Sequence, residues 1–425
     1  MKNFKPGDLN GVLFTIQSPR QDVEINLLPF IIHIDIYEDI GSPTMICDIL
    51  MKDDVNLIKN LPIVGEEVVT MVFSTPSLPP STFRFKVFEV DNEIVARDLT
   101  NKTYVLRCVS DESLLNARKG IDIAISGTVD SSVNQIMKNI IKTNKSIFTE
   151  ACKGFDTYVF PSNITPFQGI DFLRRKAVSQ TYPSSSFVFF ENQLGFNFVT
   201  VEKLIDDGLK RDSMGGVRVY RYSPIAQVSG LEDKVFRNII NYSVTNRTDT
   251  VHKYQSGAFK TEVRTFDFVS KQYDVTTYTI DKLNFKTTDQ QSRLQNTRKQ
   301  IGDVLNERVV PNLIYLPKTA DNIGSFVHEA VGPRHMFSSL LGEMTVVAHI
   351  YGDSTIKVGD MIKCELKTPE IYPATDARAQ KNKPREPEKN ITGNFIVSKL
   401  RHIISNRVNF NYTMSVELVK IGASL

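Results

Sequence analysis

Two short stretches of the 425-residue chain, LPIVGEEVVTMVFSTP (61–76) and TIKVGDMIKCELKTPE (355–370), follow the same pattern. In each, an apolar residue and a glycine precede an acidic residue, then a strand-like run, and then Thr-Pro. Alternation of apolar and polar residues is typical of a half-buried β-strand, and a glycine before it favours a turn. Gly65 and Gly359 are therefore expected to mark the same turn in two copies of one unit.

The likeness continues on both sides of these stretches. TMICDILMKDD (44–54) aligns with MTVVAHIYGDS (344–354), and residues 85–110 align with residues 395–420 without a gap. The order and spacing of the strand-like segments agree better than their residue identities. We therefore expect two related β-barrels in one chain. The alternative is that unrelated antiparallel strands merely share a common pattern.

Composition limits the classes of protein to consider. With 41% hydrophobic and 23% charged residues the chain is typical of globular proteins, and its length suffices for several domains. A formal net charge of +3 argues against a dedicated nucleic-acid binder. We find no apolar run of about 18 residues and no signal-peptide pattern at the start. The four cysteines form no CxxC motif, which favours buried free thiols in a reducing compartment.

The pattern along the chain predicts a mainly β protein with an α+β part, divided into five segments. These are a first β-barrel at 1–110, a middle α+β domain at 111–210, the start of a second barrel at 211–280, a helical or irregular insertion at 281–340, and the rest of the second barrel at 341–425. Within the last segment, residues 369–391 are charged and rich in proline, which predicts a long loop.

The middle segment carries clear local signals. Apolar residues recur at helical spacing in VDSSVNQIMKNIIKTN (129–144), behind an Asp/Ser cap. Thr165 followed by Pro166 predicts a helix start, because proline is favoured at the first helical position. SFVFFENQLGFNFVTVEKL (186–204) predicts a hairpin with its turn in ENQLG.

The hairpin expected at residues 30–51 separates two faces. Ile32, Ile34 and Ile36 alternate with polar residues and are expected to fill the barrel core. His33, Asp35 and Asp48 fall on the opposite, polar face. Two carboxylates could serve glycoside hydrolysis, but they would need a cleft and unequal environments. A solvated strand face is the simpler interpretation.

No other pattern indicates chemistry, so we expect no catalytic residue, no metal site and no cofactor. The six histidines form no HExxH motif, and HEAVGPRH (328–335) does not have a zinc-site spacing. There is no phosphate-binding glycine loop and no GxSxG motif. The basic cluster FLRRKA (172–177) is most simply the solvated face of a helix.

Taken together, the order of these segments resembles the central baseplate hub protein of contractile-tailed bacteriophages, and is similar to the N-terminal half of type VI secretion spike proteins. The segments that carry the resemblance are the N-terminal barrel, ITPFQGIDFLRRKA (164–177), SSSFVFFENQLGFNFVTVEKL (184–204), YQSGAFKTEVRTFDFVSKQY (254–273) and the closing strands from GNFIVSKLRHIIS (393–405) onward. The resemblance covers nearly the whole chain and rests on order rather than on one short motif. It implies two tail-tube-like antiparallel β-barrels per subunit with a middle α+β domain between them.

The resemblance also implies an assembly. Three subunits would form a homotrimeric ring of six barrels, a symmetry adaptor that joins the six-fold tail tube to the three-fold central spike. Fused family members continue into a needle, whereas this sequence stops at VKIGASL, so a separate spike protein is implied. Tape-measure and baseplate wedge proteins are further candidate partners, and DNA would pass only as cargo. The expected location is the tail baseplate of the virion, after synthesis in the host cytoplasm.

Within such a ring, His33, Asp35 and Asp48 would line the channel, and residues 369–391 would dock a neighbouring tail protein. Two other classes of function stay open. A peptidoglycan hydrolase at the tail tip would need a separated acid pair in a compact helical domain. A carbohydrate-binding β protein would expose aromatic residues, yet the chain has no Trp and its Phe residues mostly fall on apolar strand faces.

Overall fold

The computed structural model covers most of both expected barrels and all of the middle segment. It describes residues 5–19, 23–61, 63–76, 78–97, 100–222, 237–246, 250–280, 282–288, 311–318, 326–341, 344–367, 391–406 and 410–421. The expected loop at 369–391 lies outside these residues except for Ile391.

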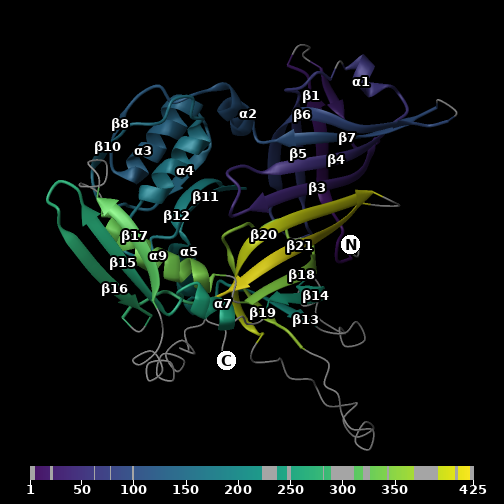
Figure 1. The fold of residues 1–425 in the computed structure, drawn as a ribbon. Coiled ribbons are helices and arrows are strands. Elements are labelled where there is room, and N and C mark those ends of the chain that lie inside the picture. Colours follow the sequence, from purple (N-terminus) through teal and green to yellow (C-terminus); the bar gives the residue numbers. More distant parts are fainter. Residues whose placement is uncertain are drawn as a thin grey trace, which may run out of the picture.

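The first barrel is built from seven strands near the N-terminus (Figure 1). They are β1 (Asn10–Gln17), β2 (Glu24–Asn26), β3 (Ile31–Asp39), β4 (Ile46–Asp53), β5 (Val68–Ser74), β6 (Ser81–Val95) and β7 (Lys102–Val109), with a short helix α1 (Leu57–Asn60) between β4 and β5. Hydrogen bonds connect them in the order β3-β4-β7-β6-β5-β1-β2.

The second barrel is a closed ring of six strands from the later part of the chain. They are β13 (Arg218–Tyr222), β14 (Asn238–Asn246), β18 (Met344–Tyr351), β19 (Met361–Glu365), β20 (Gly393–Asn406) and β21 (Phe410–Lys420). Their order is β14-β18-β21-β20-β19-β13, and pairing of β13 with β14 closes the barrel.

The two barrels repeat one topology. Strands β3, β4, β7, β6, β5 and β1 follow one another as do β14, β18, β21, β20, β19 and β13. Even an irregularity recurs, because the register shifts between Val87 and Glu89 in β6 and between Val397 and Lys399 in β20. One difference is that β1 runs antiparallel to β5 whereas β13 runs parallel to β19. The expected fold class, two such barrels with an α+β domain, is confirmed.

The turn before β5 and β19 repeats with an offset of one residue. The Glu66 N–H donates to the Val87 carbonyl at 2.7 Å, as the Gly359 N–H donates to Val397 at 3.0 Å. Gly359 therefore takes the place of Glu66, not of Gly65. All three have positive φ angles, of 100° at Gly65, 75° at Glu66 and 88° at Gly359. The turn of the first barrel has two residues with left-handed backbone, whereas the turn of the second barrel has one. Aligning the two sequences on their glycines could not reveal this difference.

The barrels are joined edge to edge. Strand β3 pairs antiparallel with β20 from His33–Ser405 to Asp39–Lys399, so both barrels belong to one thirteen-stranded sheet. Their apolar faces form a single core. At the joint, the Tyr412 ring packs against Phe73 at 5.3 Å and the His402 ring against Phe83 at 5.4 Å between centroids. The two barrels therefore share one packed core as well as one sheet.

The middle domain packs beside the first barrel around its own core. Its elements are α2 (Asp111–Arg118), β8 (Ile125–Gly127), α3 (Val129–Gln135), the π-helical turn η1 (Ile136–Ile141), β9 (Ser146–Thr149), β10 (Asp156–Tyr158), α4 (Pro166–Lys176), β11 (Phe187–Asn192), β12 (Gly195–Thr200) and α5 (Val201–Ser213). The Thr165 cap and the β11–β12 hairpin are confirmed, although Thr128 rather than an Asp/Ser pair caps α3.

A third unit lies between β14 and β18 in the sequence. It comprises α7 (Thr250–Gln255), β15 (Lys260–Asp267), β16 (Tyr273–Thr279), β17 (Asn312–Lys318) and α9 (Val327–Leu340). Strands β15 and β16, which the sequence analysis placed at the start of the second barrel, instead pair with β17 in a separate sheet. Helix α9 packs against one face of that sheet (Figure 1). A strand-like pattern does not specify which strand is its neighbour, so the sequence could not assign β15 and β16 to a separate sheet.

Candidate functional site

A polar stripe crosses the joint between the barrels on the face opposite the shared core. Asp35 (β3), Asp48 (β4) and Arg107 (β7) are successive cross-strand partners. Arg401 (β20) faces Tyr37, two residues along β3, and reaches Asp35 diagonally. Because side chains of a β-strand alternate between faces, the same strands present apolar residues to the core. The three polar residues expected to share a face, His33, Asp35 and Asp48, do lie in this stripe.

The expectation that Ile32 lies in the barrel core was wrong. A register shift between Ile31 and His33 puts Ile31, not Ile32, beside Ile34 and Ile36 in the core, and leaves Ile32 half-buried. A bulge inserts one extra residue and so turns the following side chains to the other face.

Asp35 is the most constrained member of the stripe. Arg401 donates to both carboxylate oxygens, from Nε to Oδ1 at 2.9 Å and from Nη2 to Oδ2 at 2.7 Å. His33 Nε2 lies 3.2 Å from Oδ1. Burial of the Asp35 carboxyl opposes ionisation, but the hydrogen bonds from His33 and Arg401 outweigh it and lower its pKa to about 2. Asp35 is thus an ionised, bidentate partner that ties β3 to β20.

Asp48 sits beside Asp35 in a different environment. Burial raises the pKa of Asp48, Arg107 lowers it in part, and the charge of Asp35 raises it further. Arg107 is itself engaged, with contacts of 3.2 Å to Glu89 and 2.7 Å to Asp91. The two acids therefore differ as a catalytic pair would, yet Asp35 is held by Arg401 and is not free to attack or to transfer a proton.

Acid is expected to weaken the joint through Asp35. The pKa of Asp35 is lower in the folded chain than the ordinary 3.8. Its contribution to the free energy of unfolding is therefore complete above pH 3.8 and is lost as pH falls toward 2. The size is about 2 kcal/mol. Measured by urea unfolding, Asp35→Asn should be destabilised at pH 7 and lose less stability than wild type between pH 4 and pH 2. Asp207→Asn, in an exposed ion pair with Lys203, is the control. If Asp35→Asn lost as much stability as wild type between pH 4 and pH 2, this assignment would be contradicted.

A second, buried polar network lies behind the stripe. The Tyr412 hydroxyl is 2.6 Å from His402 Nδ1, and His402 Nε2 is 3.4 Å from the Glu38 carboxylate. The N–H of Val358 donates to the other Glu38 oxygen at 3.1 Å. These contacts join β3 of the first barrel to β20, β21 and the turn before β19 of the second. Buried polar groups that are fully paired specify one arrangement of the elements that supply them.

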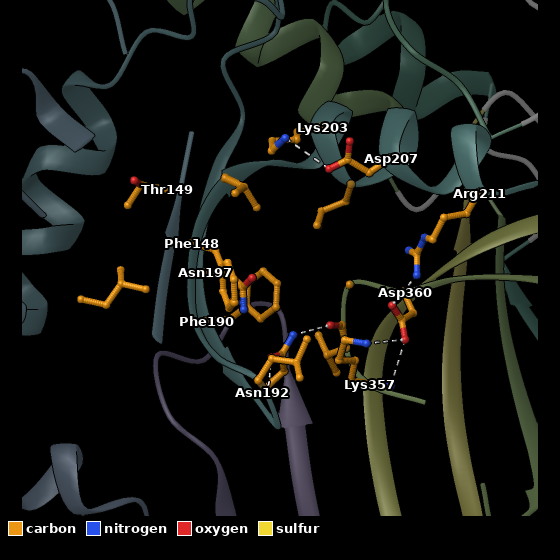
Figure 2. Close-up of a pocket in the computed structure, with 16 residues that line it drawn as sticks. Phe148, Thr149, Phe190, Asn192, Asn197, Lys203, Asp207, Arg211, Lys357 and Asp360 are labelled. Carbon is orange, nitrogen blue, oxygen red and sulfur yellow. Dashed lines mark hydrogen bonds and ion pairs between the residues drawn. The ribbon is translucent and has the colours of Figure 1, made fainter. Parts of the chain in front are cut away.

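A cavity of about 680 Å³ lies between the middle domain and the second barrel (Figure 2). Figure 2 shows Arg211 of α5 and Lys357 directed toward Asp360, at 3.0 and 3.3 Å from its carboxylate oxygens. Asn192 Nδ2 donates to the Val358 carbonyl at 3.2 Å across the same gap. Arg211 and Asn192 thus link the middle domain to the second barrel, whereas Lys357 pairs with Asp360 inside one turn. The cavity shares no residue with the polar stripe.

Sequence reasoning found the acids of the stripe but missed the basic residues that pair with them. Arg401 is 366 positions from Asp35, and only the pairing of β20 with β3 brings them together. Alternation in FIVSKLRHIIS could have placed Lys399 and Arg401 on one face, without a partner. All four cysteines are free and buried, as expected.

The described ranges hold neither a candidate metal site nor a candidate membrane-spanning helix. No three His, Cys, Asp or Glu side chains in them are grouped as metal ligands. Among the helices that the structure describes, none combines the length and apolar character that a bilayer crossing requires.

Comparison with known proteins gives a likeness of fold. No protein-family model and no curated protein matches the sequence. The tail protein from Neisseria meningitidis MC58 superposes with a TM-score of 0.56 at 11% identity, over 97% of this chain and 98% of that one. The 43 kDa tail protein of prophage MuSo2 from Shewanella oneidensis gives 0.50 at 10% identity, over 97% and 98%. The resemblance to phage tail proteins is thus confirmed for the fold.

Proposed function

We propose that this chain, which has the fold of phage tail proteins, is a structural subunit of a baseplate hub. Three copies would form a ring of six barrels that joins a six-fold tail tube to a three-fold spike. The observation that carries the proposal is the duplication: two barrels of one topology, fused edge to edge through β3 and β20. Two similar barrels in each of three chains supply six similar contacts to a six-fold neighbour.

The polar stripe is proposed to line the channel of this ring, with His33, Asp35 and Asp48 among the lining residues. A wet channel suits half-buried ionised groups, which would be costly in a dry interface. Arg401 and Arg107 are both paired with carboxylates, so neither guanidinium is free to bind the phosphates of DNA. Such a lining would let DNA pass without holding it.

The hydrolase alternative has less support. Its acid pair would be Asp35 and Asp48, and Asp35 is bound on both oxygens by Arg401. In the cavity of Figure 2 one ion pair, Arg211–Asp360, crosses between the two domains, and the described lining residues include no histidine or cysteine. We therefore propose a structural role, with a tube protein and a separate spike protein as partners.

The mass of the purified protein tests this proposal. Light scattering at micromolar concentration should give about 144 kDa, three times the 48.1 kDa of one chain. Incubation with isolated cell walls should release no soluble sugar. A stable monomer would overturn the ring, and sugar release that disappears in Asp35→Asn would favour the hydrolase.

A further inference from the structure

The three-stranded sheet of the third unit has one covered face and one open face. Helix α9 covers the first, where three side chains of β15 are buried: Thr261, Val263 and Thr265. Because side chains of a strand alternate between faces, Glu262, Arg264 and Phe266 belong to the second, which we call the open face. Cross-strand pairing adds to the open face Tyr273 and Val275 of β16 and Leu313 and Tyr315 of β17.

Large apolar side chains gather on the open face. Five of them have exposed fractions between 39% and 65%, namely Phe266, Tyr273, Val275, Leu313 and Tyr315. The turn after β15 extends this surface, because Phe268 packs edge-on against Phe266 at 5.1 Å between ring centroids. Phe268 and its neighbour Val269 are themselves exposed. Exposed apolar side chains that gather in one patch mark a surface that another molecule covers.

The charges on the open face cancel within it. Arg264 Nε lies 2.5 Å from the Glu262 carboxylate, and the Arg264 guanidinium stacks on the Tyr315 ring, 5.7 Å from its centroid. Neither charge therefore needs an ionic partner from outside. The open face fits a surface that is apolar and uncharged.

The size of the open face suits a protein rather than a small ligand. An aromatic side chain buries about 150–250 Å² when it is fully covered, so the seven exposed side chains of the face and its turn present on the order of 700 Å². A standard protein interface buries about 800 Å² on each partner. A single sugar ring or a comparable small molecule would leave most of this surface exposed.

The third unit occurs once in the chain, whereas the barrel occurs twice. It lies between β14 and β18 in the sequence, and the corresponding strands β3 and β4 are joined by residues 40–45 alone. A ring of three chains would therefore carry six barrels and three open faces. Three equal sites match a neighbour with three-fold symmetry, whereas a six-fold neighbour needs six.

We propose that the open face is the surface through which the ring binds the three-fold spike protein. The aromatic rings of Phe268, Tyr273 and Tyr315 are its main contacts, and the matching surface of the spike is apolar and uncharged. This inference rests on the proposed hub function and names the surface that faces its three-fold partner.

Binding of the purified spike trimer to the purified ring tests this assignment. Phe268→Ser with Val269→Ser removes apolar surface in the turn, and Val275→Thr with Tyr315→Thr removes it on the strands, where threonine retains β propensity. Each double variant should weaken binding at least about tenfold by biolayer interferometry, because a few aromatic anchors dominate protein interfaces. The mass of the ring by light scattering should not change.

The matched control is Phe155→Ser with Val159→Thr, which changes two exposed side chains of the middle domain. It should bind the spike trimer as wild type does. Undiminished binding by both open-face variants, an equal loss in the control, or loss of the ring in the open-face variants would overturn the docking site and leave the hub function standing. A wild-type ring that does not bind the spike trimer would overturn the proposed function itself.

Thiol labelling tests whether the open face is free before the spike binds. The four native cysteines are buried, so a single introduced thiol can be followed. In the ring without spike, Val275→Cys should react with a maleimide as fast as Val159→Cys does. Slow reaction of Val275→Cys alone would mean that another part of the chain covers the face, and would overturn the assignment.

Discussion

Glu191→Ala is expected to cost about 3–5 kcal/mol of stability, because it removes one member of a buried charged network. The Glu191 carboxylate has no exposed side-chain surface and accepts from Lys145 Nζ, the Ser110 hydroxyl and the Met45 N–H. Burial raises the pKa of Glu191, against the effect of Lys145. Because Met45 and Ser110 belong to the first barrel and Glu191 to β11, the same change should loosen the middle domain from the barrel.

Calorimetry and limited proteolysis would measure both effects. In Glu191→Ala, the midpoint of thermal unfolding should fall, and cleavage should begin within the middle domain, residues 111–210. Glu93→Ala is a suitable control, since Glu93 forms an exposed ion pair with Lys102 and should cost less than about 1 kcal/mol. Equal midpoints for the two variants would show that the Glu191 network does not hold the domains together.

Gly352→Ala is expected to destabilise the joined barrels by about 3 kcal/mol through overpacking. A Cβ atom at Gly352 would lie 1.9 Å from Cδ1 of the Tyr412 ring. That ring is fully buried, packs against Phe73, and carries the hydroxyl that bonds to His402. The ring cannot move without breaking the polar network that fixes the joint.

The effect should appear as a lower unfolding midpoint together with a change in the near-ultraviolet circular dichroism of the buried tyrosines. Gly120→Ala is the matched control, because the nearest atoms to its Cβ would be 3.7 Å away. Wild-type behaviour of Gly352→Ala would mean that Tyr412 does not occupy this place.

Local features were predictable from the sequence. Thr165 and Pro166 fix the start of α4 through backbone groups within one turn, and the ENQLG turn fixes the β11–β12 hairpin. Alternation identified Ile34 and Ile36 as core and His33, Asp35 and Asp48 as one polar face. The repeat could be recognised for the same reason, since both barrel sequences have the same order of strand-like segments and turn residues.

Strand partners and strand registers between distant parts of the chain could not be predicted in the same way. The bulge that buries Ile31 in place of Ile32, the offset of Gly359 onto Glu66 and the separate sheet of β15 and β16 all depend on the strand neighbour. Main-chain hydrogen bonds are the same for every residue, so a strand pattern does not name its partner or register.

The sequence by itself determined that this protein has two similar β units with an α+β domain between them, because hydrophobic periodicity and turn residues act over a few positions. Only the tertiary structure decided that the two units share one core, that β3 meets β20, and that Arg401 holds Asp35. The physical reason is that edge pairing is selected by packing between surfaces hundreds of residues apart, and that packing exists only once the chain has folded.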